Sequence, residues 1–163
     1  MIDSITSKGV LILGRFTPER KLVLDFIAQE LRKYNLLPII FDFERSGSRD
    51  FTETIKTLAG LSMFVIADIT KPRSSPLELQ ATVPDYQIPF IPIIQKGEKP
   101  FDMFRNLTGK YFWVFPPLAY KSTASLRKGF KKIFIDRAFS MRKRLLRKKA
   151  KSMVVQTVEE FLG

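Results

Sequence analysis

Two carboxylates follow closely after one apolar run in the middle of the chain. Residues 64–67 are apolar, Asp68 and Thr70 come directly after them, and Glu78 follows a polar loop. If the run is a strand of an open α/β sheet, Asp68 lies at its carboxyl end, where such sheets bind ligands. A carboxylate there can stabilise or attack an oxocarbenium-like carbon while an N-glycosidic bond breaks, and this chemistry needs no histidine.

Both carboxylates also have a structural interpretation. Ser75 and Glu78 have the spacing of a capping box, in which the glutamate accepts a hydrogen bond from the backbone N–H of the capping residue. The Asp68 carboxylate can likewise accept hydrogen bonds from the loop at Thr70. The spacing alone favours these structural roles over catalysis.

The end of the first apolar run carries residues that suit a nucleotide. Gly14, Arg15 and Phe16 follow residues 10–13. Glycine lets the backbone approach a ligand, and arginine suits phosphate. The helix expected to begin after Thr17 would present an N-terminus that favours anions. The alternative is a tight turn with a surface arginine, since neither a G-x-G-x-x-G fingerprint nor a Walker loop is present.

Asp42 and Phe43 follow the second apolar run, residues 37–41. Acids near the second strand of dinucleotide-binding folds bind ribose hydroxyls, so Asp42 is a candidate for that role. Phe43 is a further candidate for binding the nucleotide. The alternative is a solvated strand end.

Strand-like and helix-like segments alternate along the chain. Apolar runs predict strands at residues 10–13, 37–41, 63–67, 90–94 and 111–115. Helices are expected between them, the first beginning at Thr17-Pro18, a favourable cap and first helical position. This order predicts an α/β fold that is three-layered, mostly parallel, five-stranded and flavodoxin-like. The internal Pro92 predicts an edge position or a bulge for the fourth strand.

The composition excludes several kinds of chemistry. The chain has 163 residues and contains neither cysteine nor histidine. Ser-His and Cys-His catalysis, disulfides and the usual transition-metal sites are therefore not expected, and no metal site is predicted. No run of about 18 apolar residues is present, and the first residues do not resemble a signal peptide. We therefore expect a cytoplasmic protein.

The positive charge is concentrated near the C-terminus. The formal net charge is +12, and residues 121–152 hold 13 basic side chains against the single acid Asp136, a balance of +12. We expect residues 1–120 to form the α/β domain. Residues 121–163 are expected to form a basic amphipathic helical extension whose first half packs on the sheet.

An apolar stripe runs from Leu126 to Leu145 and continues, with a shift of phase, to Leu162. Its regularity favours association of helices, so we expect a homo-oligomer that forms through this extension. Nucleic acid, an anionic membrane surface and an acidic protein remain alternative partners for residues 121–152. No aromatic side chain lies among the basic cluster, which argues against stacking on a single strand.

Residues 10–94 resemble Toll/interleukin receptor (TIR) domains and nucleoside 2-deoxyribosyltransferase-like proteins. The matching residues are 65–68, then Ser74 or Ser75, then Glu78-Leu79. The resemblance implies that Glu78 is the catalytic carboxylate and that Asp68 and Ser74 position the ribose. Two features depart from the pattern: the Trp-Cys pair that often precedes the TIR glutamate is missing, and Ser75-Pro76 replace a glycine common in the deoxyribosyltransferases.

The resemblance implies a TIR-like domain that binds NAD or a related nucleotide and cleaves its N-glycosidic bond. The nucleotide would be a substrate or ligand, and no separate cofactor is expected. The alternative is a non-catalytic signalling module that assembles with itself or a partner and uses a nucleotide as a switch. A nucleic-acid accessory protein that acts through residues 121–152 is a third hypothesis.

Overall fold

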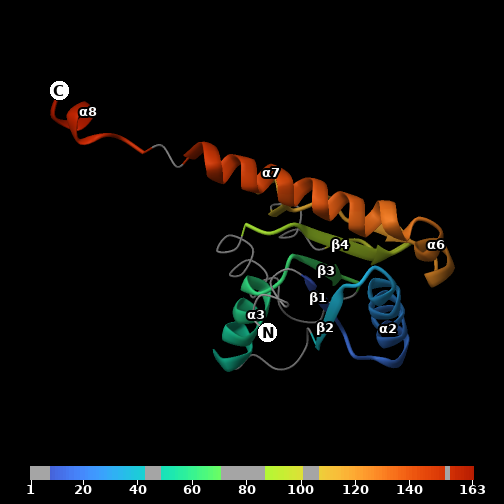
Figure 1. Ribbon diagram of the computed structural model, residues 1–163. Helices are drawn as coiled ribbons and strands as arrows, with labels where there is room; N and C mark the ends of the chain where they lie inside the picture. Colours follow the sequence, from blue (N-terminus) through green and yellow to red (C-terminus); the bar gives the residue numbers. More distant parts are fainter. Residues whose placement is uncertain (1–7, 43–48, 71–86, 101–106, 153–154) are drawn as a thin grey trace.

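The computed structural model describes residues 8–42, 49–70, 87–100, 107–152 and 155–163, and Figure 1 shows how they are arranged. Their strands form one parallel sheet in the order β2-β1-β3-β4-β5. The strands are β1 (Gly9–Gly14), β2 (Leu37–Asp42), β3 (Phe64–Asp68), β4 (Phe90–Gln95) and β5 (Leu118–Tyr120). The predicted α/β fold with a parallel five-stranded sheet is therefore confirmed.

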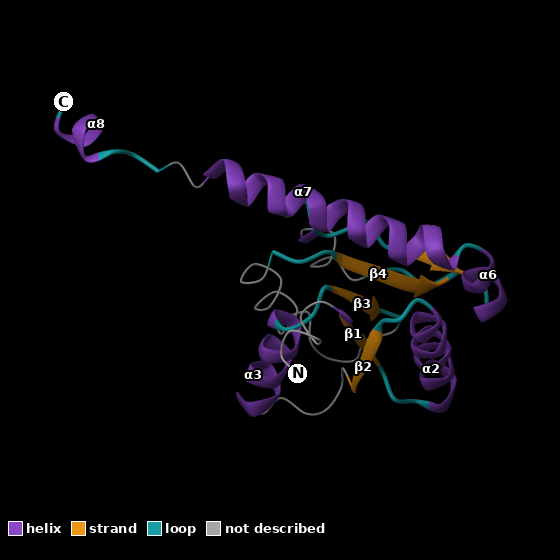
Figure 2. Ribbon diagram, viewed as in Figure 1, coloured by secondary structure: helices purple, strands orange, loops and turns teal. Residues whose placement is uncertain are grey.

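The sheet is covered on both faces, as expected for parallel strands made of continuous apolar runs. Figure 2 shows α2 (Pro18–Lys33) and α3 (Arg49–Gly60) on opposite sides of the sheet. One core cluster joins Ile12 and Ile66 to α2, and the other joins Leu13 and Ala67 to α3. Neighbouring residues of each strand thus contribute to opposite cores, which makes the fold three-layered.

Helix α2 begins as the sequence predicts. The Thr17 side chain accepts a hydrogen bond from the Arg20 backbone N–H at 3.4 Å, and Pro18 occupies the first helical position. Near the end of β1, an added Cβ on Gly14 would lie 2.6 Å from a methyl carbon of Leu24. The absence of a side chain at position 14 therefore lets α2 pack closely on the first strand.

The edge position that Pro92 predicts for its strand is wrong, because β4 lies between β3 and β5. The alternative, a bulge, is not contradicted: three steps along β4, from Phe90 to Ile93, correspond to four along its neighbour, from Val114 to Leu118. Backbone bonds from β4 alternate between its neighbours, with the Phe90 N–H donating to Trp113 and the Ile93 carbonyl accepting from Ile69. By this alternation the Pro92 nitrogen faces the β5 side. On that side, β4 pairs with its neighbour at Phe90 and again from Ile93 onward, and Pro92 lies in the unpaired interval between them. The missing N–H of Pro92 therefore costs the sheet no hydrogen bond.

The predicted fifth strand is also wrong in position. Residues 111–115 form only an isolated bridge, from Val114 to Phe90, while Trp113 and Val114 are buried. The strand follows the Pro116-Pro117 pair and spans Leu118–Tyr120. The aromatic run serves packing more than ladder pairing, which explains why its strand-like composition is misleading.

The helical pattern after Ser122 is divided into several elements. Ser122 caps α6 (Thr123–Lys128) through a capping box with Ser125. The π-helical turn η1 (Lys131–Asp136) follows, then α7 (Arg137–Ser152) and the short α8 (Val158–Leu162). The first part of the apolar stripe, including Phe134 and Ala138, is buried in the core.

Candidate functional site

A polar cleft of about 610 Å³ lies at the carboxyl edge of the sheet. Its described walls come from the β1–α2 turn, the end of β3 and the end of β4. They comprise Arg15, Thr17, Pro18, Glu19, Arg20, Thr70, Gln95 and Glu98. The chain leaves β1 toward β2 on one side and returns to β3 on the other, so the cleft lies where open α/β folds bind ligands.

Asp68 lies beneath the cleft with both carboxylate oxygens occupied. Oδ1 accepts hydrogen bonds from the Thr70 hydroxyl at 2.5 Å and from the Thr70 N–H at 3.2 Å. Oδ2 accepts a hydrogen bond from the Tyr120 hydroxyl at 3.0 Å and lies 3.6 Å from Arg20 Nη1. The side chain is 1% exposed. The sequence-based alternative, in which Asp68 binds the loop at Thr70, is therefore confirmed as a contact.

Burial affects the ionisation of both members of the Asp68–Tyr120 pair. Removal from water raises the pKa of Asp68 above its usual value, although the hydrogen bonds from Thr70 and Tyr120 and the charge of Arg20 oppose the shift. Burial and the neighbouring Asp68 charge raise the pKa of Tyr120. Tyr120 therefore keeps its proton and acts as a donor to Asp68.

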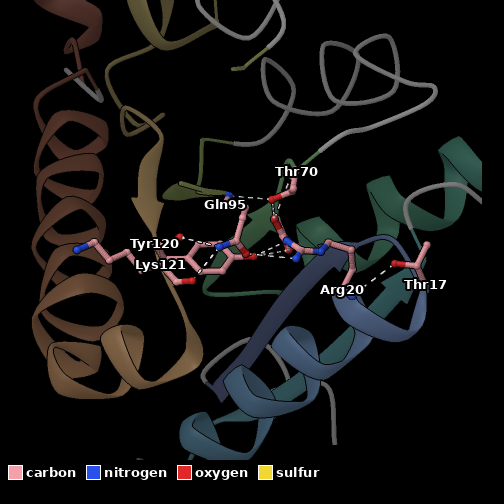
Figure 3. Close-up of polar contacts among 7 residues, drawn as sticks. Thr17, Arg20, Thr70, Gln95, Tyr120 and Lys121 are labelled. Carbon is pink, nitrogen blue, oxygen red and sulfur yellow. Dashed lines mark hydrogen bonds and ion pairs between the residues drawn. The ribbon is translucent and has the colours of Figure 1, made fainter. Parts of the chain in front are cut away.

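Arg20 and Gln95 extend this arrangement across the top of the sheet, as Figure 3 shows. Arg20 donates to the Tyr120 hydroxyl at 2.9 Å and to Gln95 Oε1 at 3.2 Å. The Gln95 N–H donates to the Thr70 hydroxyl at 2.9 Å, and Gln95 Nε2 donates to the Lys121 carbonyl at 2.8 Å. The network thus joins α2, β3, β4 and the segment that enters the C-terminal helices.

Sequence reasoning missed Arg20, Gln95 and Tyr120. Each comes from a different element, and no local spacing connects them. Gln95 is the last residue of β4, so the rule about carboxyl ends of strands could have identified it. The sequence did not identify Tyr120 as the end of a strand, because the fifth strand was predicted at residues 111–115 and lies at Leu118–Tyr120.

The predicted nucleotide-binding residues have different positions. Arg15 lines the cleft, whereas Gly14 is packed against Leu24. Phe16 is 44% exposed, and the Lys21 ammonium lies 5.1 Å from the centre of its ring. Asp42 is partly buried at the end of β2, paired in register with Gly14.

Three of the predicted site residues, Phe43, Ser74 and Glu78, lie outside the described residues. The catalytic role assigned to Glu78 and the binding roles of Phe43 and Ser74 therefore stay predictions. The predicted functional role of Asp68 is likewise untested, although its surroundings are now known.

Two searches of the described residues gave negative findings. No cluster of three or more aspartate, glutamate, histidine or cysteine side chains suited to a metal ion occurs among them. None of the described helices has the length and apolarity needed to cross a bilayer.

Comparison of the chain with models of protein families gave no match, and comparison with curated proteins gave none either.

Proposed function

We propose that this chain binds NAD or a related nucleotide in the cleft and cleaves the bond between its base and its ribose. The observation that carries the proposal is the polar cleft at the carboxyl edge of a parallel sheet, beside the turn from β1 into α2. The resemblance of residues 10–94 to TIR domains supplies the reaction and the glutamate, Glu78.

Arg15 is the residue most suited to a phosphate. Helix N-termini usually bind anions through their first amide groups, but Pro18 has no N–H and the Arg20 N–H is already capped by Thr17. The helix start therefore offers fewer donors than usual. A guanidinium at the cleft wall can instead form charge-assisted hydrogen bonds to phosphate oxygens.

The cleft also offers acceptors for sugar hydroxyls. Glu19 and Glu98 line it together with Arg15 and Arg20, so its described walls carry both signs of charge. Such a mixture suits a ligand with an anionic group and several hydroxyls, as a nucleotide has. The two carboxylates offset the two guanidinium groups, so these four residues give the walls no net positive charge with which to favour a purely anionic ligand.

Asp68 is a positioning residue in this proposal. Its oxygens already accept bonds from Thr70 and Tyr120, so it has no free face with which to approach a substrate. It fixes Thr70 and Arg20, which line the cleft. The reacting carboxylate is then Glu78, which would stabilise positive charge on the ribose carbon as the base departs with the bonding electrons. Water would add to that carbon and release a proton.

The test is turnover of NAD followed by chromatography of the products at high protein concentration. Wild type, Glu78→Gln and the control Glu53→Gln, an exposed acid on α3, would be compared with nucleosides as parallel substrates. Release of free base by wild type and the control, but not by Glu78→Gln, is expected. If no substrate releases base even after assembly is confirmed by light scattering, cleavage is excluded.

The second candidate function is a non-catalytic module that binds the nucleotide as a switch. The burial of Asp68 favours this second function, because its carboxylate is bonded to other side chains of the protein and is not accessible to a ligand in the cleft. Equilibrium dialysis with labelled NAD distinguishes the two functions. Saturable binding that Arg15→Gln weakens, without release of free base, would identify the module.

A further inference from the structure

The inner side of α7 is already occupied by the chain's own core. Ala138, Met141 and Leu145 are buried against the sheet and its neighbouring segments. Figure 1 shows the helix lying along the side of the sheet beside β4. The apolar stripe of this helix up to Leu145 is therefore not available to a partner, and the outer surface must provide any further contact.

The outer surface of α7 is cationic. Lys143, Arg147 and Lys151 are spaced by four residues, so they lie on one face of the helix, and all three are exposed. None of them is joined to a carboxylate in the part of the chain that the structure describes. The helix Arg137–Ser152 itself contains no acidic residue.

The last part of α7 extends beyond the core. Residues 146–151 are all exposed, and four of the six are lysine or arginine. Leu146 is 57% exposed beside these cations. Figure 1 shows this end of the helix continuing past the sheet toward the C-terminus.

Exposed apolar side chains follow the cationic helix along the chain. Val158, Phe161 and Leu162 have helical spacing in α8, and Phe161 and Leu162 are each 76% exposed. Glu159 and Glu160 fall on the other side of this short turn. Only five residues separate Ser152 from Val158, so the apolar turn remains within roughly 20 Å of the end of α7.

We infer that α7 and α8 together form a docking surface for a lipid bilayer with anionic headgroups. Cationic side chains near such a surface are attracted to its negative potential, and a second, apolar contact is needed for stable attachment. Lys143, Arg147 and Lys151 supply the first contact. Phe161 and Leu162 supply the second by entering the boundary between headgroups and acyl chains.

A nucleic-acid duplex would use the same cations but would leave the apolar side chains of α8 in water. Phosphate contacts are electrostatic and need no apolar neighbour. An anionic bilayer accounts for both observations, the unpaired cations and the exposed Phe161 and Leu162 that follow them. This inference is independent of the function proposed for the cleft.

The experiment is co-sedimentation of the full chain with vesicles of phosphatidylcholine, with and without about a quarter of phosphatidylserine. Binding is expected only to the vesicles that contain phosphatidylserine. Lys143→Gln/Arg147→Gln/Lys151→Gln should weaken it about a hundredfold. Phe161→Ser/Leu162→Ser should weaken it by at least about tenfold. Lys8→Gln/Arg32→Gln/Lys99→Gln removes the same charge from exposed positions elsewhere and should change binding less than about twofold.

Two results would overturn the inference. One is failure of the wild-type chain, with native circular dichroism, to bind the anionic vesicles. The other is binding of a duplex DNA probe that the α7 triple substitution abolishes, that Phe161→Ser/Leu162→Ser leaves intact, and that occurs without vesicle binding. The second result would assign the cations to nucleic acid.

Discussion

The Tyr120 hydroxyl donates a hydrogen bond to Asp68 Oδ2 at 3.0 Å, although the two residues are 52 positions apart. The same hydroxyl accepts a bond from Arg20, so one side chain of β5 joins the acid at the end of β3 to the first turn of α2. This contact is the centre of the polar network below the cleft.

Replacement of Tyr120 by phenylalanine is expected to destabilise the protein by about 1–3 kcal/mol. The substitution removes the donor to a buried carboxylate oxygen and an acceptor for Arg20 while leaving the ring in place. Urea denaturation measures the free energy of unfolding. Tyr34→Phe is the control, because Tyr34 is 39% exposed, and it should change stability by less than about 0.5 kcal/mol. Equal effects of the two substitutions would contradict a special role for Tyr120.

The contribution of Asp68 to the free energy of unfolding should fall as the pH rises, the opposite of the usual behaviour of an aspartate. Burial raises the pKa of Asp68 in the folded state above its ordinary value of 3.8, so the folded protein holds this proton more tightly than the unfolded chain. The contribution is fully present below about pH 3.8 and is lost as the pH rises through the folded pKa.

Asp68→Asn provides the comparison, because asparagine does not titrate. The free energy of unfolding of wild type minus that of the variant should fall as the pH rises above 3.8. Urea denaturation over the range from weakly acidic to neutral pH measures it. A difference that grows with pH would mean that the hydrogen bonds and Arg20 outweigh burial.

Gly14→Ala should destabilise the fold by about 1–3 kcal/mol, since the new methyl group would lie 2.6 Å from Leu24 Cδ2 in a fully buried contact. Thermal unfolding followed by circular dichroism measures the loss. Gly109→Ala is the matched control, because nothing lies within 4 Å of the added atom there. In a double-mutant cycle with Leu24→Ala, the double variant should lose less stability than the sum of the two single variants, because the shorter side chain relieves the clash. Additive effects would mean that contact with Leu24 is not the cause.

Arg15→Gln should weaken nucleotide binding roughly ten- to hundredfold, because a charge-assisted hydrogen bond to phosphate contributes about 1.5–3 kcal/mol. Isothermal titration calorimetry with NAD and with the corresponding nucleoside separates the contributions. The nucleoside, which carries no phosphate, should bind both proteins equally. A matching loss of nucleoside affinity would show that Arg15 acts on the shape of the cleft instead.

The strands and the first helix were predictable because their evidence is local. Residues 10–13 and 37–41 are apolar at every position or nearly so, and Thr17-Pro18 begins a helix through a cap and a fixed backbone angle. Pro92 led to a wrong prediction of an edge position by the same local reasoning. A proline is tolerated within an inner strand where the neighbouring strand has no carbonyl that pairs with that position. That condition depends on the course of another segment.

The amino-acid sequence by itself determined the parallel α/β architecture, the start of α2 and the concentration of positive charge in residues 121–152. Each of these follows from a property of a short stretch of chain: the period of its apolar residues, its capping residue or its composition. Only the tertiary structure decided that Arg20 and Tyr120 lie beside Asp68, with Gln95 bonded to Arg20, and that Leu145 is buried while Leu146 is exposed. These relationships arise from packing between distant segments, whose free energy depends on which surfaces meet and not on the spacing of neighbouring residues.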